Sequence, residues 1–402
     1  TVTPSPTPTG RSAVGWIGEF AYLFGNETYP SVALYWHVPT EAWGNSTPYP
    51  GQGDNWTGAV LGGELYVVGR FDPGLFVPTN EFRKFTPDGA GGGTWTQLAN
   101  YPMTITMLAA AADTMNGLIY AAGGYNGSTG VPNAYVYDVA GNTWSPIASL
   151  PQARLCVGGA FLNGKFYVVA GLEVSGFTYT NTLYEYDPGL GSWSSRANLP
   201  QGVAFNWSSV TTDGNYIYQV GGGGGYASWP ALNAVQVYDA QGDSWFLETS
   251  LPAANGTNSA LYVGDPDTAY ILSSGGWDGA QYIGQTFKGT GLFVGMAEAS
   301  SVQFPLSSFQ FLESFPNPFT RSTTICYHIS EARQVTLSVS DLSGRLVRTL
   351  VDQPSSPATI QSSNSVVWDG TDSSGKPVGS GIYVVRLGAG ELQGSRTILV
   401  LR

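Results

Sequence analysis

A repeated spacing of Tyr-Asp, Trp and Pro is the feature that most limits how this chain can fold. It occurs in VYDVAGNTWSPIASLP, EYDPGLGSWSSRANLP and VYDAQGDSWFLETSLP, which end at Pro151, Pro200 and Pro252. In each segment the tyrosine precedes the tryptophan by seven residues, and the proline follows it by seven. Two degenerate copies keep the second distance, from Trp43 to Pro50 and from Trp95 to Pro102. Five copies of one spacing indicate repeated units that must stack to bury their faces.

Upstream of each tryptophan the sequence predicts a β-hairpin. Three clear copies are LNGKFYVVAG, MNGLIYAAGG and DGNYIYQVGG, which end at Gly171, Gly124 and Gly222. Their Asn-Gly and Asp-Gly pairs favour the positive φ angles of a two-residue hairpin turn, and the flanking residues alternate as in strands. The glycine series continues at Gly25, Gly69 and Gly276, so we expect six units with a period of about fifty residues.

Each unit is therefore expected to have four strands, with glycine ending the second, tyrosine in the third and tryptophan opening the fourth. This pattern resembles the kelch motif over roughly residues 1–297, and the resemblance implies an all-β, six-bladed kelch-type β-propeller. Three positions depart from it: Ala170 replaces a glycine, Trp36-His37 replaces Tyr-Asp, and Arg70 follows Gly69. We expect the repeat aspartates Asp138, Asp187 and Asp239 to close turns. The repeat tryptophans are expected to pack between blades: Trp43, Trp95, Trp144, Trp193 and Trp245.

The sixth unit lacks the tryptophan and the Leu-Pro that end the others. Aligning PTGRSAVGW, from Pro8, with PQARLCVGG, from Pro151, pairs Arg11 with Arg154 and puts the chain's first residues where the missing outer strand belongs. We predict that residues 1–12 form this edge strand, through Val2, Pro8 and Arg11, and close the propeller of residues 13–297. In the alternative, GLFVGMA from Gly291 completes the sixth blade, and the N-terminal strand pairs with an open edge of another subunit.

The C-terminal quarter predicts a second, smaller domain. After a linker at residues 298–312, residues 313–402 contain alternating strands and glycine turns, as in an Ig-like β-sandwich. The domain resembles the Ig-like sorting domains of bacterial type IX secretion substrates and the Ig-like domain of flagellar hook-capping proteins. The resemblance lies in PNPF at 316–319, DLSG at 341–344, WDG at 368–370, Gly375 and GIY at 381–383. It implies export across an outer membrane and attachment at the cell surface.

The C-terminal domain also contains two neighbouring carboxylates, Asp369 and Asp372, in WDGTDSSG. They raise the question of a calcium site. Calcium takes six or more oxygen ligands, so a plain glycine turn is the favoured interpretation. No cofactor is expected.

Charge and composition limit the partners. Only 11% of residues are charged and the net charge is −12, without a basic stripe, so nucleic acid is excluded as a partner. No apolar run reaches the roughly 18 residues of a membrane-spanning segment. A sequence that begins at Thr1 with a Thr/Pro-rich stretch predicts an exported, extracellular protein whose signal peptide has been removed.

The residue content and motif spacing argue against two enzyme classes found on propellers. Copper radical oxidases need two histidines, but the propeller has His37 alone, because His328 lies in the C-terminal domain. The Asp-box of sialidases reads Ser-x-Asp-x-Gly-x-Thr-Trp, and DVAGNTW from Asp138 has one residue too many. We expect no enzymatic activity.

Two hypotheses about function follow. In the first, the protein is a structural subunit that associates with copies of itself into a filament, sheath or layer at the cell surface. In the second, loops on one face of the propeller bind a glycan or a protein, with aromatic side chains stacking on sugar rings. The candidate residues are Tyr125, Tyr226, Trp229 and Trp277.

Overall fold

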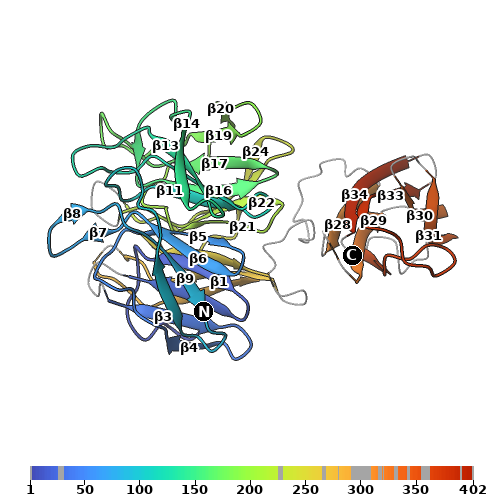
Figure 1. The fold of residues 1–402 in the computed structure, drawn as a ribbon, viewed down its shortest axis with the longest axis horizontal. Coiled ribbons are helices and arrows are strands. Elements are labelled where there is room, and N and C mark those ends of the chain that lie inside the picture. The colour runs from blue at the N-terminus through green and yellow to red at the C-terminus, as the bar shows by residue number, and fades with distance from the viewer. Residues whose placement is uncertain are drawn as a thin grey trace. The chain divides into compact units, whose positions relative to one another are not determined.

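The chain forms two compact units, Thr1–Val294 and Gly295–Arg402, and both are built of β-strands (Figure 1). The structure is a computed structural model that describes residues 2–25, 31–224, 230–264, 269–278, 280–290, 309–315, 319, 321–329, 334–341, 345–354, 363–389 and 392–400. Among these residues there is no helix, and therefore none that is long and apolar enough to cross a membrane.

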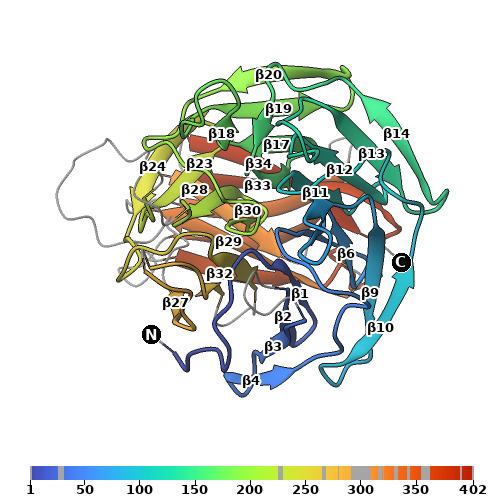
Figure 2. The ribbon, with the colours of Figure 1, turned by 90° about the vertical axis from the view of Figure 1, so that its left-hand side faces the viewer.

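The first unit is a six-bladed β-propeller of antiparallel sheets (Figures 1 and 2). Blade one contains β1 (Ala13–Ile17), β2 (Phe20–Phe24), β3 (Ala33–His37) and β4 (Ala42–Asn45). Blade two contains β5 (Thr57–Leu61), β6 (Glu64–Val68), β9 (Phe82–Pro87) and β10 (Gly93–Gln97), and blade three contains β11 (Ala109–Asp113), β12 (Leu118–Ala122), β13 (Ala134–Asp138) and β14 (Thr143–Ile147). Blade four contains β16 (Gly158–Leu162), β17 (Lys165–Val169), β19 (Leu183–Asp187) and β20 (Ser192–Arg196). Blade five contains β21 (Val210–Thr212), β22 (Tyr216–Val220), β23 (Val235–Asp239) and β24 (Ser244–Glu248), and blade six contains β25 (Ser259–Val263), β26 (Tyr270–Ser274) and β27 (Thr286–Thr290).

The innermost strands close a ring, because each contacts its two neighbours in the order β1, β5, β11, β16, β21, β25 and back to β1. The outermost strands β4, β10, β14, β20 and β24 form the rim in Figure 2. In each blade, the loop that joins the second strand to the third lies at the same end of the propeller as the loops that join one blade to the next. This end is here called the loop face. The tight hairpins meet at the other end, here called the turn face.

The repeat tryptophans fasten neighbouring blades together. In Trp95, Trp144, Trp193 and Trp245, the indole Nε1 donates a hydrogen bond to a carbonyl oxygen of the preceding blade, at 2.7–3.2 Å. The acceptors are Thr47, Ala99, Ala148 and Ala197, each four residues after the preceding blade's tryptophan. The rings also pack edge-on against aromatic side chains between the sheets, as Trp144 does on Tyr101 at 4.8 Å. The repeat spacing thus encodes contacts between blades.

The N-terminal segment lies along the free edge of β27. Val2 pairs with Thr286 in an antiparallel bridge, and the amides of Val2 and Ser5 donate to the carbonyls of Thr286 and Gly284 at 3.1 and 2.7 Å. The Trp43 Nε1 donates to the carbonyl oxygen of Thr3 at 2.9 Å, the same bond that the other repeat tryptophans make. These contacts correspond to closure of blade six by the chain's own N-terminus; GLFVGMA lies outside the described residues.

The register of this segment corrects the sequence alignment by two residues. Thr286 opens β27 as Ala134 opens β13, and their partners are Val2 and Ile147. Pro6 therefore corresponds to Pro151, and Arg11 corresponds to Cys156. Pro8 and Arg11 were aligned wrongly with Pro151 and Arg154, and the tryptophan position falls two places before Thr1. A shift of two keeps every side chain on the same face of a strand, so residue alternation cannot detect it.

The second unit is a β-sandwich. One sheet contains β28 (Phe309–Phe315), β29 (Thr323–Ile329) and β32 (Ser363–Trp368); the other contains β31 (Leu346–Pro354), β30 (Gln334–Asp341), β33 (Gly381–Ala389) and β34 (Leu392–Val400). Its core includes Phe319, Leu337, Trp368 and Val385. β28 begins at Phe309, so this strand starts inside the segment 298–312 that the sequence assigned to a linker.

Candidate functional site

Three adjacent loops form a continuous ridge on the loop face of blades two, three and four. They are residues 71–78, 125–130 and 172–179, and the first carries the two-residue strands β7 (Phe71–Asp72) and β8 (Val77–Pro78). A Cβ atom on Gly127 would lie 3.3 Å from Pro78, and one on Gly130 would lie 2.6 Å from Val174. The loops therefore contact one another, and Gly130 has no room for a side chain.

Large apolar side chains project from the tips of the two outer loops of this ridge. Leu75, Phe76 and Val77 are 73%, 80% and 45% exposed, and Phe177 is 54% exposed. Phe76 and Phe177 both have left-handed backbones, with φ of 58° and 50°. Phenylalanine rarely adopts this conformation, which costs roughly 1–2 kcal/mol. The loops thus hold two strained, partly exposed aromatic residues at their tips, and Phe76 packs edge-on against Phe71 at 5.3 Å. We call Leu75, Phe76, Val77 and Phe177 the apolar tips.

Arg70 anchors the loop of blade two from beneath. Its buried guanidinium donates to the Gln52 carbonyl oxygen, and it forms ion pairs with Asp72 at 3.1 Å and Glu81 at 3.3 Å. The backbone N–H groups of Leu75 and Gly74, together with Arg70, hold the pKa of Asp72 below its usual value. The replacement of a repeat glycine by arginine at position 70 is therefore what fixes this loop, a role that the sequence did not reveal.

A ring of residues with left-handed backbones surrounds the propeller axis just before the innermost strands. The ring has six members, none of them glycine, and their φ angles lie between 52° and 60°. Each member lies twelve residues after the tryptophan position of the preceding blade. The members are Arg11, Asn55, Met107, Cys156, Phe205 and Thr257. Backbone bonds link neighbours, for instance Arg11 N–H to the Thr257 carbonyl at 3.0 Å and Met107 N–H to the Asn55 carbonyl at 3.3 Å. Sequence patterns do not predict this ring, because its side chains share no chemistry.

The Cys156 thiol of this ring is unsuited to nucleophilic chemistry at neutral pH. It is almost fully buried and lies 3.5 Å from the Met107 sulfur. Burial raises its pKa to about 12, although the Arg11 charge opposes the shift. Since the thiolate is the reactive form, Cys156 acts as a packing residue.

Two of the four predicted ligand-binding aromatics are described, and the structure does not bring them together. Tyr125 lies in blade three, bridging Thr106 and Gly130 through its backbone, and its half-buried ring packs on the cluster around Leu155. Trp277 lies in blade six, bridging Gly256, and its half-buried ring meets Tyr282 edge-on at 5.0 Å. Tyr226 and Trp229 lie outside the described residues.

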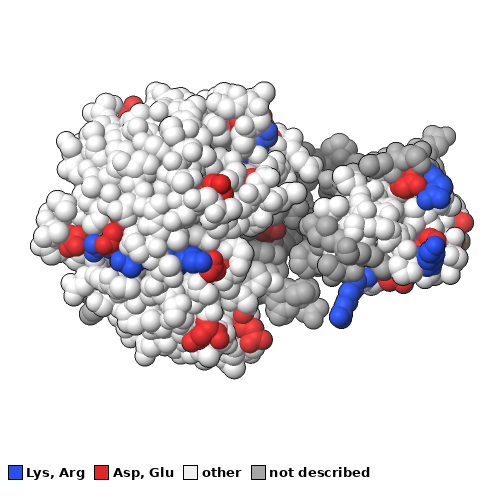
Figure 3. All heavy atoms as spheres, viewed as in Figure 1, with Lys and Arg blue, Asp and Glu red and all other residues white. Residues whose placement is uncertain are grey.

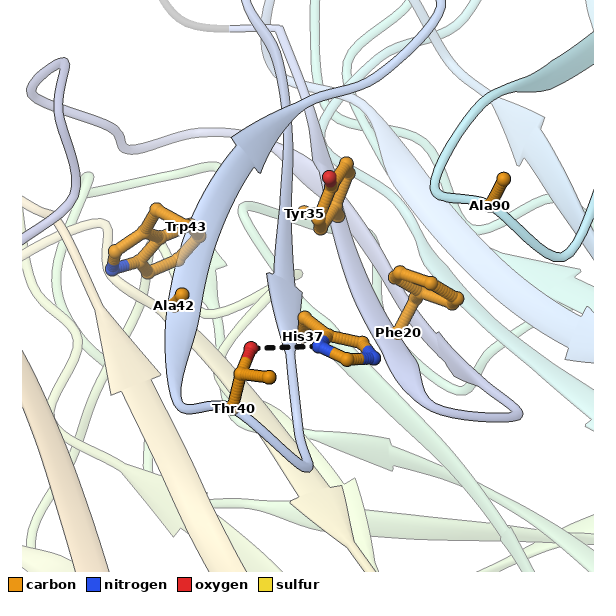
Figure 4. A pocket seen from close by; sticks show the side chains of 7 residues that line it. All are labelled: Phe20, Tyr35, His37, Thr40, Ala42, Trp43 and Ala90. Atoms are coloured by element: carbon orange, nitrogen blue, oxygen red, sulfur yellow. Dashed lines mark hydrogen bonds between the residues drawn. The ribbon is translucent and has the colours of Figure 1, made fainter.

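A separate pocket of about 260 Å³ lies at the turn-face end of blade one (Figure 4). Its lining consists of Phe20, Tyr35, His37, Thr40, Ala42, Trp43 and Ala90. The Phe20 ring meets Tyr35 edge-on at 5.1 Å and lies 4.9 Å from His37. The His37 ring nitrogens lie 2.7 Å from the Thr40 hydroxyl and 3.4 Å from the Glu19 carboxylate. Polar groups and partly exposed aromatic faces therefore meet in one small hollow.

Most Lys and Arg side chains of the described propeller are held in ion pairs. Figure 3 shows a surface that is largely uncharged, with most basic side chains beside acidic ones. The pairs include Lys84 with Glu64, Lys165 with Asp187, and Arg196 with Glu185. The repeat aspartates close turns as predicted: the carboxylates of Asp138, Asp187 and Asp239 accept backbone N–H groups two residues on.

The two carboxylates in the C-terminal domain are engaged in local bonds. Asp369 accepts from the Thr371 amide and hydroxyl and pairs with Arg348 at 2.8 Å, while Asp372 accepts from Ser374 and Lys376 amides. These bonds hold the pKa of each carboxyl below its usual value. Across the described residues, no group of three or more His, Cys, Asp or Glu side chains is placed to bind a metal ion.

Comparisons with known proteins agree with this architecture. Residues 108–151 match the kelch motif, and residues 321–391 match the FlgD Ig-like domain. The solved structure described as "Structure of YjhT" is similar at a TM-score of 0.57 and 15% identity, covering 71% of this chain and 96% of that one. At that identity the likeness concerns the fold alone. A search of curated proteins found no significant match. The chain is thus a kelch-type propeller followed by a C-terminal Ig-like domain.

Proposed function

We propose that this protein is a non-enzymatic, exported structural subunit that associates with copies of itself at the cell surface through the apolar tips. The observation that carries the proposal is the pair of strained, exposed phenylalanines, Phe76 and Phe177. Strained backbone conformations of this kind cluster at functional sites in proteins. Four large apolar side chains on one ridge also mark an interaction surface.

The free energy available from burying the apolar tips favours a protein partner for this ridge. Full burial of a large apolar side chain contributes about 1.5–3 kcal/mol, so covering the four apolar tips would contribute several kcal/mol. The low charge content of the chain, 11% of residues, reduces the desolvation cost of contact between copies. A resemblance to surface-attachment domains at the C-terminus supports a location outside the cell.

Sedimentation velocity and negative-stain electron microscopy of the full chain test the proposal. We expect concentration-dependent oligomers, and we expect the double substitution Phe76→Ser/Phe177→Ser to lower the association constant at least about tenfold, since tenfold corresponds to about 1.4 kcal/mol. A wild-type protein that remains a monomer at all concentrations would contradict self-association.

A matched control comes from the opposite face. Met115 and Leu190 are 84% and 78% exposed on hairpins of the turn face. The double substitution Met115→Ser/Leu190→Ser removes a comparable apolar area, and we expect it to leave association unchanged. Equal loss in both double variants would show that general surface hydrophobicity, not the ridge, drives assembly.

The alternative is a glycan- or protein-binding module that uses the loop face without self-association. The half-buried rings of Tyr125 and Trp277 on that face favour it. Glycan-array binding by a monomeric wild type, lost in Trp277→Ala, would support this function over assembly.

A further inference from the structure

We propose that the pocket of blade one binds a single neutral sugar ring, a function separate from the assembly proposed above. Phe20 and His37 supply partly exposed aromatic rings that tilt onto each other, with centroids 4.9 Å apart and planes inclined by 32°. His37, Thr40 and Glu19 supply donors and acceptors at its edge. An apolar face bordered by a few polar groups is the usual composition of a small-molecule site.

Tyr35 forms the fixed wall of the pocket. A Cβ atom on Gly44 or Gly91 would lie 2.3 or 2.2 Å from the Tyr35 side chain, so both glycines leave room for this ring. The Trp43 ring, in contrast, turns to the other side of β4 (Figure 4), where it bonds Thr3. The wall is therefore built in advance, which lowers the entropy cost of binding.

Blades two and four show that the fold itself does not require these aromatics. Phe20, Tyr35 and His37 occupy the register positions that in blade two hold Glu64, Lys84 and Thr86. There Lys84 and Thr86 bond Glu64 at 2.6–3.0 Å. In blade four the positions of Phe20 and His37 hold an ion pair, Lys165 with Asp187.

Compared with blades two and four, blade one thus has a half-open aromatic pocket in place of paired polar side chains. Repeated units provide an internal reference, because packing demands at equivalent positions are similar. The difference therefore indicates a role beyond packing.

Charge and size define the ligand class. Glu19 borders the pocket, Glu41 lies in the same turn as Thr40, and Asp88 caps the turn that carries Ala90. Lys288 of blade six is paired with Glu41. These carboxylates would repel the carboxylate of an acidic sugar, so the pocket favours neutral sugars. A volume of about 260 Å³ lies just below the roughly 300–1,000 Å³ of drug-sized sites, which suits one ring.

Saturation-transfer NMR on the full-length protein tests the proposal. The neutral probes are the methyl glycosides of glucose, galactose and mannose; the acidic probes are glucuronic acid and N-acetylneuraminic acid, and a proline-rich hexapeptide represents a different class. We expect at least one neutral probe to bind with a dissociation constant on the order of 1 mM, and the acidic probes and peptide to bind more weakly. Phe20→Ala should weaken binding roughly tenfold.

Two further variants separate the site from general damage. Tyr216→Ala removes the aromatic side chain at the position of blade five that corresponds to Phe20, and it should leave binding unchanged. His37→Asp installs the residue that blades three, four and five carry, so it keeps the turn but removes the ring; it should weaken binding. No saturable binding by any neutral probe, tighter binding of the peptide, or equal loss in Tyr216→Ala would overturn the proposal.

Discussion

Ala170 has a left-handed backbone, with φ of 54°, at a position where Gly123, Gly221 and Gly275 stand in other blades. Its amide donates to the Thr182 carbonyl at 2.8 Å, so the chain cannot relax without losing that bond. An alanine in this conformation costs roughly 1–2 kcal/mol, whereas glycine adopts it freely. The kelch motif thus has glycine at this position because the backbone must be left-handed there. Ala170 adopts the same conformation with backbone strain.

We predict that Ala170→Gly stabilises the propeller by about 0.5–1 kcal/mol. Relief of backbone strain exceeds the roughly 0.4–1 kcal/mol that glycine adds to the entropy of the unfolded chain. Ala160→Gly, in the strand interior of β16, should instead destabilise by roughly 0.5–1 kcal/mol. Urea denaturation of both variants measures the difference, and destabilisation by Ala170→Gly would refute the account of strain.

At the level of strands, one backbone unit of blade four makes hydrogen bonds to blade five through both its carbonyl and its amide. The Ala197 carbonyl accepts from Trp245 Nε1 and its amide donates to the Asp243 carboxylate, both at 2.8 Å. Tyr238, the kelch tyrosine, donates to the same carboxylate at 2.8 Å. Blade three makes the same arrangement with Asn142 in place of aspartate. The tryptophan, the tyrosine and the turn residue therefore act together.

Asp243→Asn should lower stability at pH 7 and remove part of its dependence on pH. The Ala197 amide, Tyr238 and Arg196 hold the pKa of Asp243 below its usual 3.8. A carboxyl with a lowered folded pKa contributes stability above the unfolded pKa, and this contribution disappears as the pH falls through the folded pKa. The difference in melting temperature between wild type and variant should thus shrink below about pH 4. A difference that stays constant from pH 7 to pH 3 would contradict it.

At the scale of the whole molecule, ring closure depends on a short N-terminal segment. Val2, Ser5 and Thr9 donate backbone bonds to blade six, and Thr3 accepts from Trp43 of blade one. Residues of the segment thus join the first blade to the last. Since stacked blades cover one another's faces, an open ring would expose two of them.

Deletion of residues 1–9 should lower the melting temperature by several degrees, because a loss of 1 kcal/mol corresponds to about 2–4 °C in a domain of this size. The peptide TVTPSPTPT, added in excess, should restore part of that loss by strand complementation, and a scrambled peptide should not. Differential scanning calorimetry measures both effects. An unchanged melting temperature in the deletion variant would show that the segment does not hold the ring.

The sequence alone predicted the repeat, its period and its hairpins, because turn residues and strand alternation depend on neighbours a few residues apart. It also identified the tryptophans and turn aspartates, which recur at fixed distances. Only the folded structure shows the register of the N-terminal strand, since a shift of two residues leaves the alternation of side chains between the two faces unchanged. It alone revealed the ring around the axis, the anchor at Arg70 and the pocket beside Tyr35. Each of these depends on which side chains long-range folding brings together, and local spacing does not record that.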